Sequence, residues 1–260
     1  MADSSKQANT YLGLIGLVDA DVVAGTTPGD LIADVLPRCV PESGLARETR
    51  LYADPSGARI RISLDEQGGP LAAHVSFPAV GRLPVRLKGF VPRPEDTYAD
   101  AHAYYEVLGG GEVLYPVVAT VVDPHAIGEW GQDITGSLQL TVFPHRFEVF
   151  GSAADFSLHQ QTTAPGRPQY AAKAFVPSGI VERDANTPAE PFGLFTGVVT
   201  GTDERVVTLT GNRIVAVAVE TYGGSLTLVA NRAAFRELPQ AGNIVRAKGW
   251  LSGQFYPSVS

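Results

Sequence analysis

A short pattern of lysine, a small residue, an aromatic residue and an apolar residue occurs three times in this 260-residue chain. The copies read RLKGFVP (86–92), AAKAFVP (171–177) and RAKGWLS (246–252). When the flanking residues of such copies also align, the chain contains a repeated module, and a repeat restricts the possible folds strongly.

The flanks of the C-terminal copy predict a small β-rich module. Segment 213–221 alternates apolar with small or polar residues, which is typical of a half-buried strand, and YGG (222–224) favours a hairpin turn before the return strand 225–230. Segment 231–238 favours a short helix capped by Asn231. A last strand over 243–255 is expected to bend at its glycines.

The two other copies have comparable flanks. Segment 134–142 aligns with 209–217, with FPHR (143–146) at the hairpin tip, and 58–71 aligns with 213–226. A helix over 28–38 is predicted in the N-terminal copy. Polar, Gly- or Pro-rich segments at 93–111 and 181–191 are interpreted as linkers. The sequence therefore predicts three modules, at 10–92, 112–177 and 192–256.

The order of strands, hairpin, helix and glycine-bent strand resembles the OB-fold, a small Greek-key barrel. The C-terminal module is most similar to the barrels of bacterial single-stranded-DNA-binding proteins, through its alternating strand, its short Ala-rich helix and the ending GNIVRAKGWL (242–251). The resemblance implies a mainly β fold of three tandem OB-like barrels with short helices. It also implies binding of single-stranded nucleic acid.

Two interpretations of the repeated segment stay open. The glycine would allow the bend that closes a small barrel, and the aromatic ring would fill the interior. Alternatively, the ring would stack on bases while lysine and arginine contact phosphates. The second interpretation gives these candidate nucleic-acid-binding residues: Arg86, Lys88, His145, Arg146, Lys173, Arg213, Tyr222, Arg246, Lys248, Trp250, Phe255 and Tyr256.

Charge leaves two kinds of partner open. The net charge of −7 opposes indiscriminate binding to nucleic acid, but 192–260 holds 6 Lys and Arg against 4 Asp and Glu. A protein-interaction scaffold or assembly component that pairs through exposed edge strands is the alternative function, with a protein partner or a homo-oligomer.

Catalytic and metal-binding patterns are lacking. The five histidines show no i, i+2 or i, i+4 spacing, Cys39 is the single cysteine, and no phosphate-binding loop or nucleophile elbow occurs. We therefore expect a non-enzymatic binding protein without cofactor or metal. A polar N-terminus and the lack of an 18-residue apolar run favour a cytoplasmic protein without a membrane partner.

Overall fold

The computed structural model describes residues 13–17, 28–42, 48–91, 101–121, 133–181 and 188–258. This part of the chain is mainly β, as the sequence predicts. Its strands are β1 (Val40–Glu42), β2 (Thr49–Ala53), β3 (Arg59–Leu64), β4 (Pro70–Ser76), β5 (Leu83–Phe90), β6 (His102–Gly109), β7 (Glu112–Val121), β8 (Ile134–Phe150), β9 (Ala174–Val176), β10 (Phe192–Val206), β11 (Arg213–Thr221), β12 (Gly224–Asn231) and β13 (Ile244–Pro257). Its longer helical elements are α2 (Pro28–Val35), α4 (Ala153–Thr163) and α5 (Ser178–Val181), with 3-10 turns η2 (Leu36–Arg38) and η3 (Arg232–Ala234).

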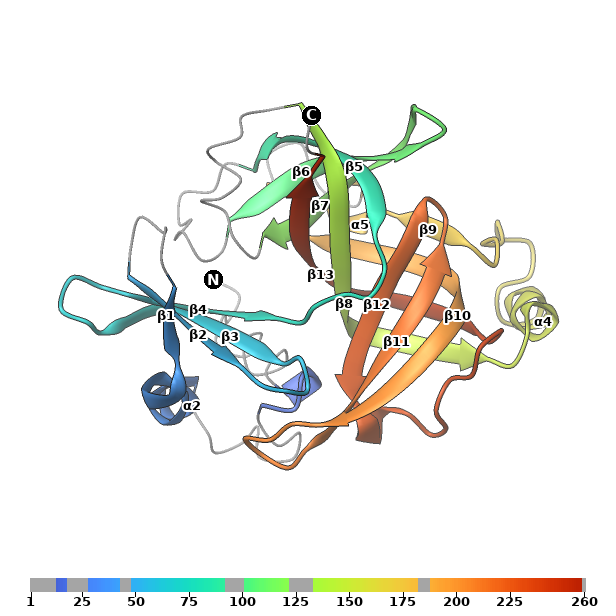
Figure 1. The fold of residues 1–260 in the computed structure, drawn as a ribbon. Helices are drawn as coiled ribbons and strands as arrows, with labels where there is room; N and C mark the ends of the chain where they lie inside the picture. Colours follow the sequence, from blue (N-terminus) through green and yellow to red (C-terminus); the bar gives the residue numbers. More distant parts are fainter. Residues whose placement is uncertain are drawn as a thin grey trace.

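The N-terminal strands form a four-stranded antiparallel sheet in the order β1-β2-β3-β4. It lies beside the larger body of the molecule, with α2 next to it (Figure 1). The predicted hairpin between β3 and β4 is confirmed, and Gly68 adopts a positive φ of 80° in its turn. The predicted helix over 28–38 is also confirmed, as α2 followed by η2.

The other described strands form one nine-stranded sheet that closes twice on itself. The first circle runs β10-β11-β12-β8-β13 and returns to β10. The second circle runs β5-β6-β7-β13-β8 and returns to β5. In Figure 1 the cyan-to-green strands of the second circle lie in the upper part of the molecule, and the orange strands of the first circle lie below them and to the right.

Strands β8 and β13 belong to both circles because they are long, with 17 and 14 residues. They pair with each other from Ile244 opposite Phe150 to Pro257 opposite Gly136. The first part of β8 pairs with β5 and its middle pairs with β12, whereas the first part of β13 pairs with β10 and its later part with β7. Both β8 and β13 are therefore members of each circle.

One hydrophobic core fills both circles. Leu138, Leu140 and Val142 of β8 alternate inward, and Val245, Ala247 and Leu251 do the same on β13. Fully burying a Val or Leu side chain contributes about 1.5–3 kcal/mol. A second cluster, with Ile60, Ile62, Phe77 and Phe143 among its members, joins the four-stranded sheet to the outside of the first circle.

The predicted structural equivalence of the three lysine-containing copies is wrong. Lys88 lies on β5, Lys248 lies on β13, and Lys173 precedes β9, so the three lysines do not occupy equivalent strands. Strand pairing also crosses the predicted boundaries at 92 and 177, because β5 pairs with β8 and β13 pairs with β7. Every half-buried strand alternates in the same way, so short strands align without sharing a position in the fold.

Several local predictions are corrected as well. Part of the predicted linker 93–111 is strand β6, whose residues Ala103, Tyr105 and Val107 alternate into the core. Gly110 and Gly111, both at positive φ, then make the hairpin turn to β7. Of the predicted linker 181–191, residues 182–187 lie outside the described part.

Two other segments differ from expectation because strand pairing overrides local signals. Segment 143–146, expected at a hairpin tip, lies inside β8 opposite β13. The predicted helix over 231–238 is reduced to η3, although Asn231 does cap it by accepting a hydrogen bond from the backbone N–H of Ala233.

Candidate functional site

Five of the predicted binding residues converge on one surface, formed by residues 143–150 of β8 and 244–250 of β13; we call it the ribbon. In the paired strands, Arg246 lies opposite Glu148, Lys248 opposite Arg146 and Trp250 opposite Phe143. The odd-numbered residues 245, 247 and 251 point into the core. Because side chains alternate along a strand, Arg246, Lys248 and Trp250 point to the outer face.

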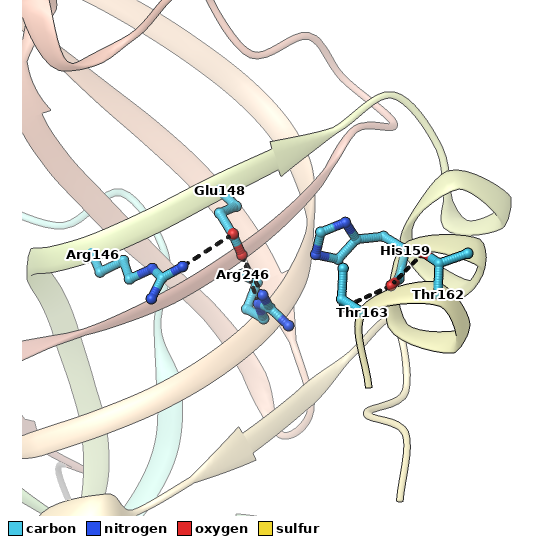
Figure 2. A network of polar contacts seen from close by, with 6 residues as sticks. All are labelled: Arg146, Glu148, His159, Thr162, Thr163 and Arg246. Atoms are coloured by element: carbon cyan, nitrogen blue, oxygen red, sulfur yellow. Dashed lines mark hydrogen bonds and ion pairs between the residues drawn. The ribbon is translucent and has the colours of Figure 1, made fainter. Parts of the chain in front are cut away.

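Charge on the ribbon is unbalanced. The Glu148 carboxylate accepts a 2.9 Å hydrogen bond from Nε of Arg246 and lies 3.6 Å from an Arg146 nitrogen. Figure 2 shows Glu148 between these two arginines. The four side chains at these two cross-strand positions carry three positive charges and one negative charge, a local net of +2 on a chain of −7. The Arg146 side chain is 81% exposed.

The end of the ribbon is held by α4. Ser152 caps this helix by accepting a hydrogen bond from the backbone N–H of Asp155. His159 on the helix contacts the ring of Phe150 at 5.0 Å, and the Arg246 guanidinium lies 5.9 Å from the centre of the same ring. Figure 2 shows the His159 side chain projecting from the helix toward Arg246. This packing fixes the direction of Arg246.

His145 is the extra residue of a β-bulge. Lys248 pairs with Arg146 and Gly249 pairs with Pro144, so the strand register skips His145. Pro144 cannot donate to the ladder, and a bulge redirects the side chain at that point. The His145 ring meets Phe192 edge-on at 5.1 Å. Partial burial, followed by the charge of Lys248, lowers the pKa of His145 below its usual value.

Trp250 serves packing as well as the surface. Its indole N–H donates to the hydroxyl of Thr120 at 2.8 Å, and its half-buried ring meets Phe192 at 5.1 Å and His102 at 5.4 Å. The ring therefore joins strands of both circles. For this residue the architectural interpretation of the repeated segment fits the contacts better than an open stacking platform.

Four predicted cations lie elsewhere, each beside a carboxylate. Arg86 lies 3.0 Å from Glu106, Lys173 lies 2.8 Å from Glu220 and Arg213 lies 2.5 Å from Glu204. Lys88 is paired with Asp133, and this hydrogen bond raises the pKa of Lys88. The structure does not bring these residues to the ribbon, and their charges are locally compensated.

The remaining predicted aromatics are also dispersed. Tyr222 is 51% exposed at the hairpin between β11 and β12. Phe255 is buried in the core, where its ring lies 5.8 Å from that of Tyr105. Tyr256 lies at the far end of β13, donates a hydrogen bond to Gln139 and carries the guanidinium of Arg82 at 4.8 Å from its ring.

Sequence reasoning missed Glu148 and Phe150 of the ribbon, and Phe192 of β10, whose ring packs against His145 and Trp250. The alternation in HRFEVF (145–150) contains a usable signal, because it places Arg146, Glu148 and Phe150 on one face of a strand. Their proximity to Arg246 depends on a strand pairing between residues almost a hundred positions apart.

Comparison of the chain with protein-family models, with curated proteins and with solved structures gives no match. Within the described ranges, none of the helices has both the length and the apolar character needed to span a membrane. Nor do three or more His, Cys, Asp or Glu side chains in those ranges form a group able to hold a metal ion.

Proposed function

We propose that this chain is a non-enzymatic binding protein that holds single-stranded nucleic acid across the ribbon. The observation that carries the proposal is the convergence of Arg146, Arg246 and Lys248 on one outer face with a single carboxylate among them. Phosphates supply most of the affinity in such complexes through arginine and lysine. We further propose that each five-stranded circle is an OB-like barrel. The OB-fold is a small Greek-key barrel of five strands.

In this proposal, contacts with phosphate groups supply most of the binding free energy, and base stacking contributes less. Stacking of a base on an aromatic ring contributes about 1–3 kcal/mol where the ring face is open. Trp250 is held by Thr120, Phe192 and His102, so its face is largely used within the protein. His145, exposed on the bulge, is the aromatic group best placed beside the cations.

The test compares charge changes of opposite sign on the ribbon. A fluorescently labelled oligothymidylate is titrated with protein at low salt, and the dissociation constant is measured by anisotropy. Arg146→Gln and Lys248→Gln are each expected to weaken binding about five-fold, since one charge contact at about 4 Å in water is worth about 1 kcal/mol. Glu148→Gln is expected to strengthen binding, because it releases two arginines from their carboxylate.

Lys173→Gln is the matched control, because Lys173 is a paired surface lysine away from the ribbon. It should leave the dissociation constant unchanged. Absence of binding by the wild-type protein at low salt, or equal weakening by Lys173→Gln and Lys248→Gln, would contradict the proposal.

The sheet edge β4 favours a second candidate function, an interaction scaffold. Among the described strands β4 pairs with β3 alone, which leaves one side of its backbone for pairing with an extended segment of a protein partner or a second copy. Light scattering, which measures the molar mass in solution, tests the self-association that this second function includes. A dimer that Ala73→Pro dissolves supports pairing at this edge, whereas a monomer at all concentrations excludes self-association.

A further inference from the structure

The β-bulge in β8 places His145 on the same outer face as the ribbon cations. Side chains alternate along a regular strand, so His145 and Arg146 would point to opposite faces without the bulge. The bulge changes this direction, because the His145 ring meets Phe192 edge-on at 5.1 Å, and the Phe192 ring in turn meets Trp250 of the outer face at 5.1 Å. His145 is also exposed. An ionisable ring therefore lies within the cationic surface, where alternation alone would have directed it away.

The charges around His145 are mainly positive. Arg146 follows it on β8, and the charge of Lys248 on β13 acts on its ring. On β10, which also packs against it, the contact is the uncharged ring of Phe192. Glu148 is the one acidic residue of the ribbon, and two arginines already contact its carboxylate. A proton on His145 therefore adds to a local excess of positive charge.

Without a ligand these surroundings favour the neutral ring. Partial burial, followed by the charge of Lys248, lowers the pKa of His145 below the ordinary histidine value. A bound phosphate counteracts the effect of Lys248, because it offsets the lysine charge and attracts the proton. Protonation of His145 and binding of an anion to the ribbon should therefore strengthen each other, and linkage makes the factor the same in both directions.

We propose that His145 is a proton-dependent phosphate contact of the ribbon, so that single-stranded nucleic acid binds more tightly in mildly acidic solution than at neutral pH. The inference rests on the proposed function of the ribbon and adds its regulation. A protonated imidazole carries a charge and donates from both ring nitrogens, whereas the neutral ring keeps one N–H donor and no charge. Histidine is also the side chain whose ordinary pKa lies between about pH 5 and about pH 8.

Oligonucleotide titrations of the full chain at several pH values test this proposal. The probe is an oligothymidylate with a pH-insensitive dye and no terminal phosphate, because neither thymine nor a phosphodiester changes charge in this range. Lowering the pH from about 8 to about 5 at constant ionic strength should lower the dissociation constant of the wild type about three- to five-fold, the effect of one added charge contact in water.

Two substitutions at the bulge separate charge from shape. His145→Gln keeps a polar side chain and should lose most of the pH dependence. His145→Arg carries a permanent charge, so its dissociation constant should be low and nearly the same at every pH. The matched control is His159→Gln, since His159 packs on Phe150 at the other end of the β8 part of the ribbon. That variant should retain most of the pH dependence, whatever its effect on affinity.

NMR titration of the His145 ring gives a readout in the unaltered chain. By linkage, saturating oligothymidylate should raise the pKa of His145 by about 0.5 to 0.7, which expresses the same three- to five-fold factor. Binding that does not vary with pH, or pH dependence that His145→Gln retains and His159→Gln abolishes, would overturn this inference and leave the ribbon as a binding site. Absence of binding at every pH would overturn both proposals.

Discussion

At the scale of single residues, Asp54 connects the four-stranded sheet to the first circle. Its buried carboxylate accepts hydrogen bonds from the backbone N–H groups of Ser56 (2.9 Å), Thr208 (3.1 Å) and Leu209 (3.3 Å), and from the Tyr52 hydroxyl (2.9 Å). Burial acts to raise the pKa of Asp54, but hydrogen bonds from Ser56, Thr208 and Tyr52 outweigh it and hold the pKa below 3.8. The ionised carboxylate is therefore the form that joins the two parts.

The pH dependence of stability follows from that direction. Because the pKa of Asp54 is lower in the folded state, its contribution is present above pH 3.8 and is lost as pH falls through the folded value. Asp54→Asn should lower the free energy of unfolding at pH 7 by about 2 kcal/mol, as loss of hydrogen bonds to a charged group does. Urea denaturation at several pH values measures the difference between variant and wild type. A difference that stays constant down to pH 2 would refute this role.

At the scale of elements, the close approach of β8 and β13 requires a glycine at the bulge. A Cβ at Gly249 would meet the backbone oxygen of Phe143 and would lie 2.7 Å from the Cα of Pro144. Both are backbone atoms of the opposing strand, so they can move apart only if the strand pair opens. In the C-terminal copy of the repeated segment, RAKGWLS (246–252), the glycine thus has an architectural role.

Gly249→Ala should destabilise the protein by about 2 kcal/mol or more, because crowding within a packed structure costs about 1–3 kcal/mol. Gly201→Ala on β10 is the control, since its Cβ would have nothing within 4 Å. That variant should unfold within about 0.5 kcal/mol of wild type, the range of harmless surface changes. Chemical denaturation measures both, and equal stability of the two variants would contradict the explanation.

What the sequence could predict is local. Alternation and a two-residue turn identified the hairpin at Tyr222 and Gly223 because both signals lie within a few residues. The placement of FPHR (143–146) at a hairpin tip was wrong, because it followed from aligning 134–142 with 209–217, whereas the segment lies inside β8 and pairs with β13. The same holds for the candidate site. Arg246 and Lys248 were predicted from their own short segment, whereas Glu148 lies beside them only because β8 pairs with β13.

At the scale of the whole molecule, the two circles cannot separate, because each contains both β8 and β13. A tandem array of independent modules would place its pairings within each module. Here removal of β13 takes one strand from both circles and exposes a core that runs through them. No repeat in the sequence predicts this arrangement, since a shared strand leaves the same alternating pattern as an unshared one.

Unfolding of the two circles should therefore be one cooperative event. Hydrogen exchange in mild denaturant should show the slowest amides of β6 and β11 opening with the same free energy, although these strands belong to different circles. A difference of several kcal/mol between them would indicate independent units. Deletion of 244–260 is expected to leave neither circle folded, as monitored by circular dichroism.

The salt dependence of oligonucleotide binding tests the functional proposal most directly. For single strands the logarithm of the binding constant falls with the logarithm of salt concentration with a slope of about −0.7 per phosphate contact, so the three ribbon cations predict a slope of about −2. Lys248→Gln should reduce its magnitude by about 0.7, and Lys173→Gln should not change it. A slope near zero, or one that Lys248→Gln leaves unchanged, would contradict phosphate binding at the ribbon.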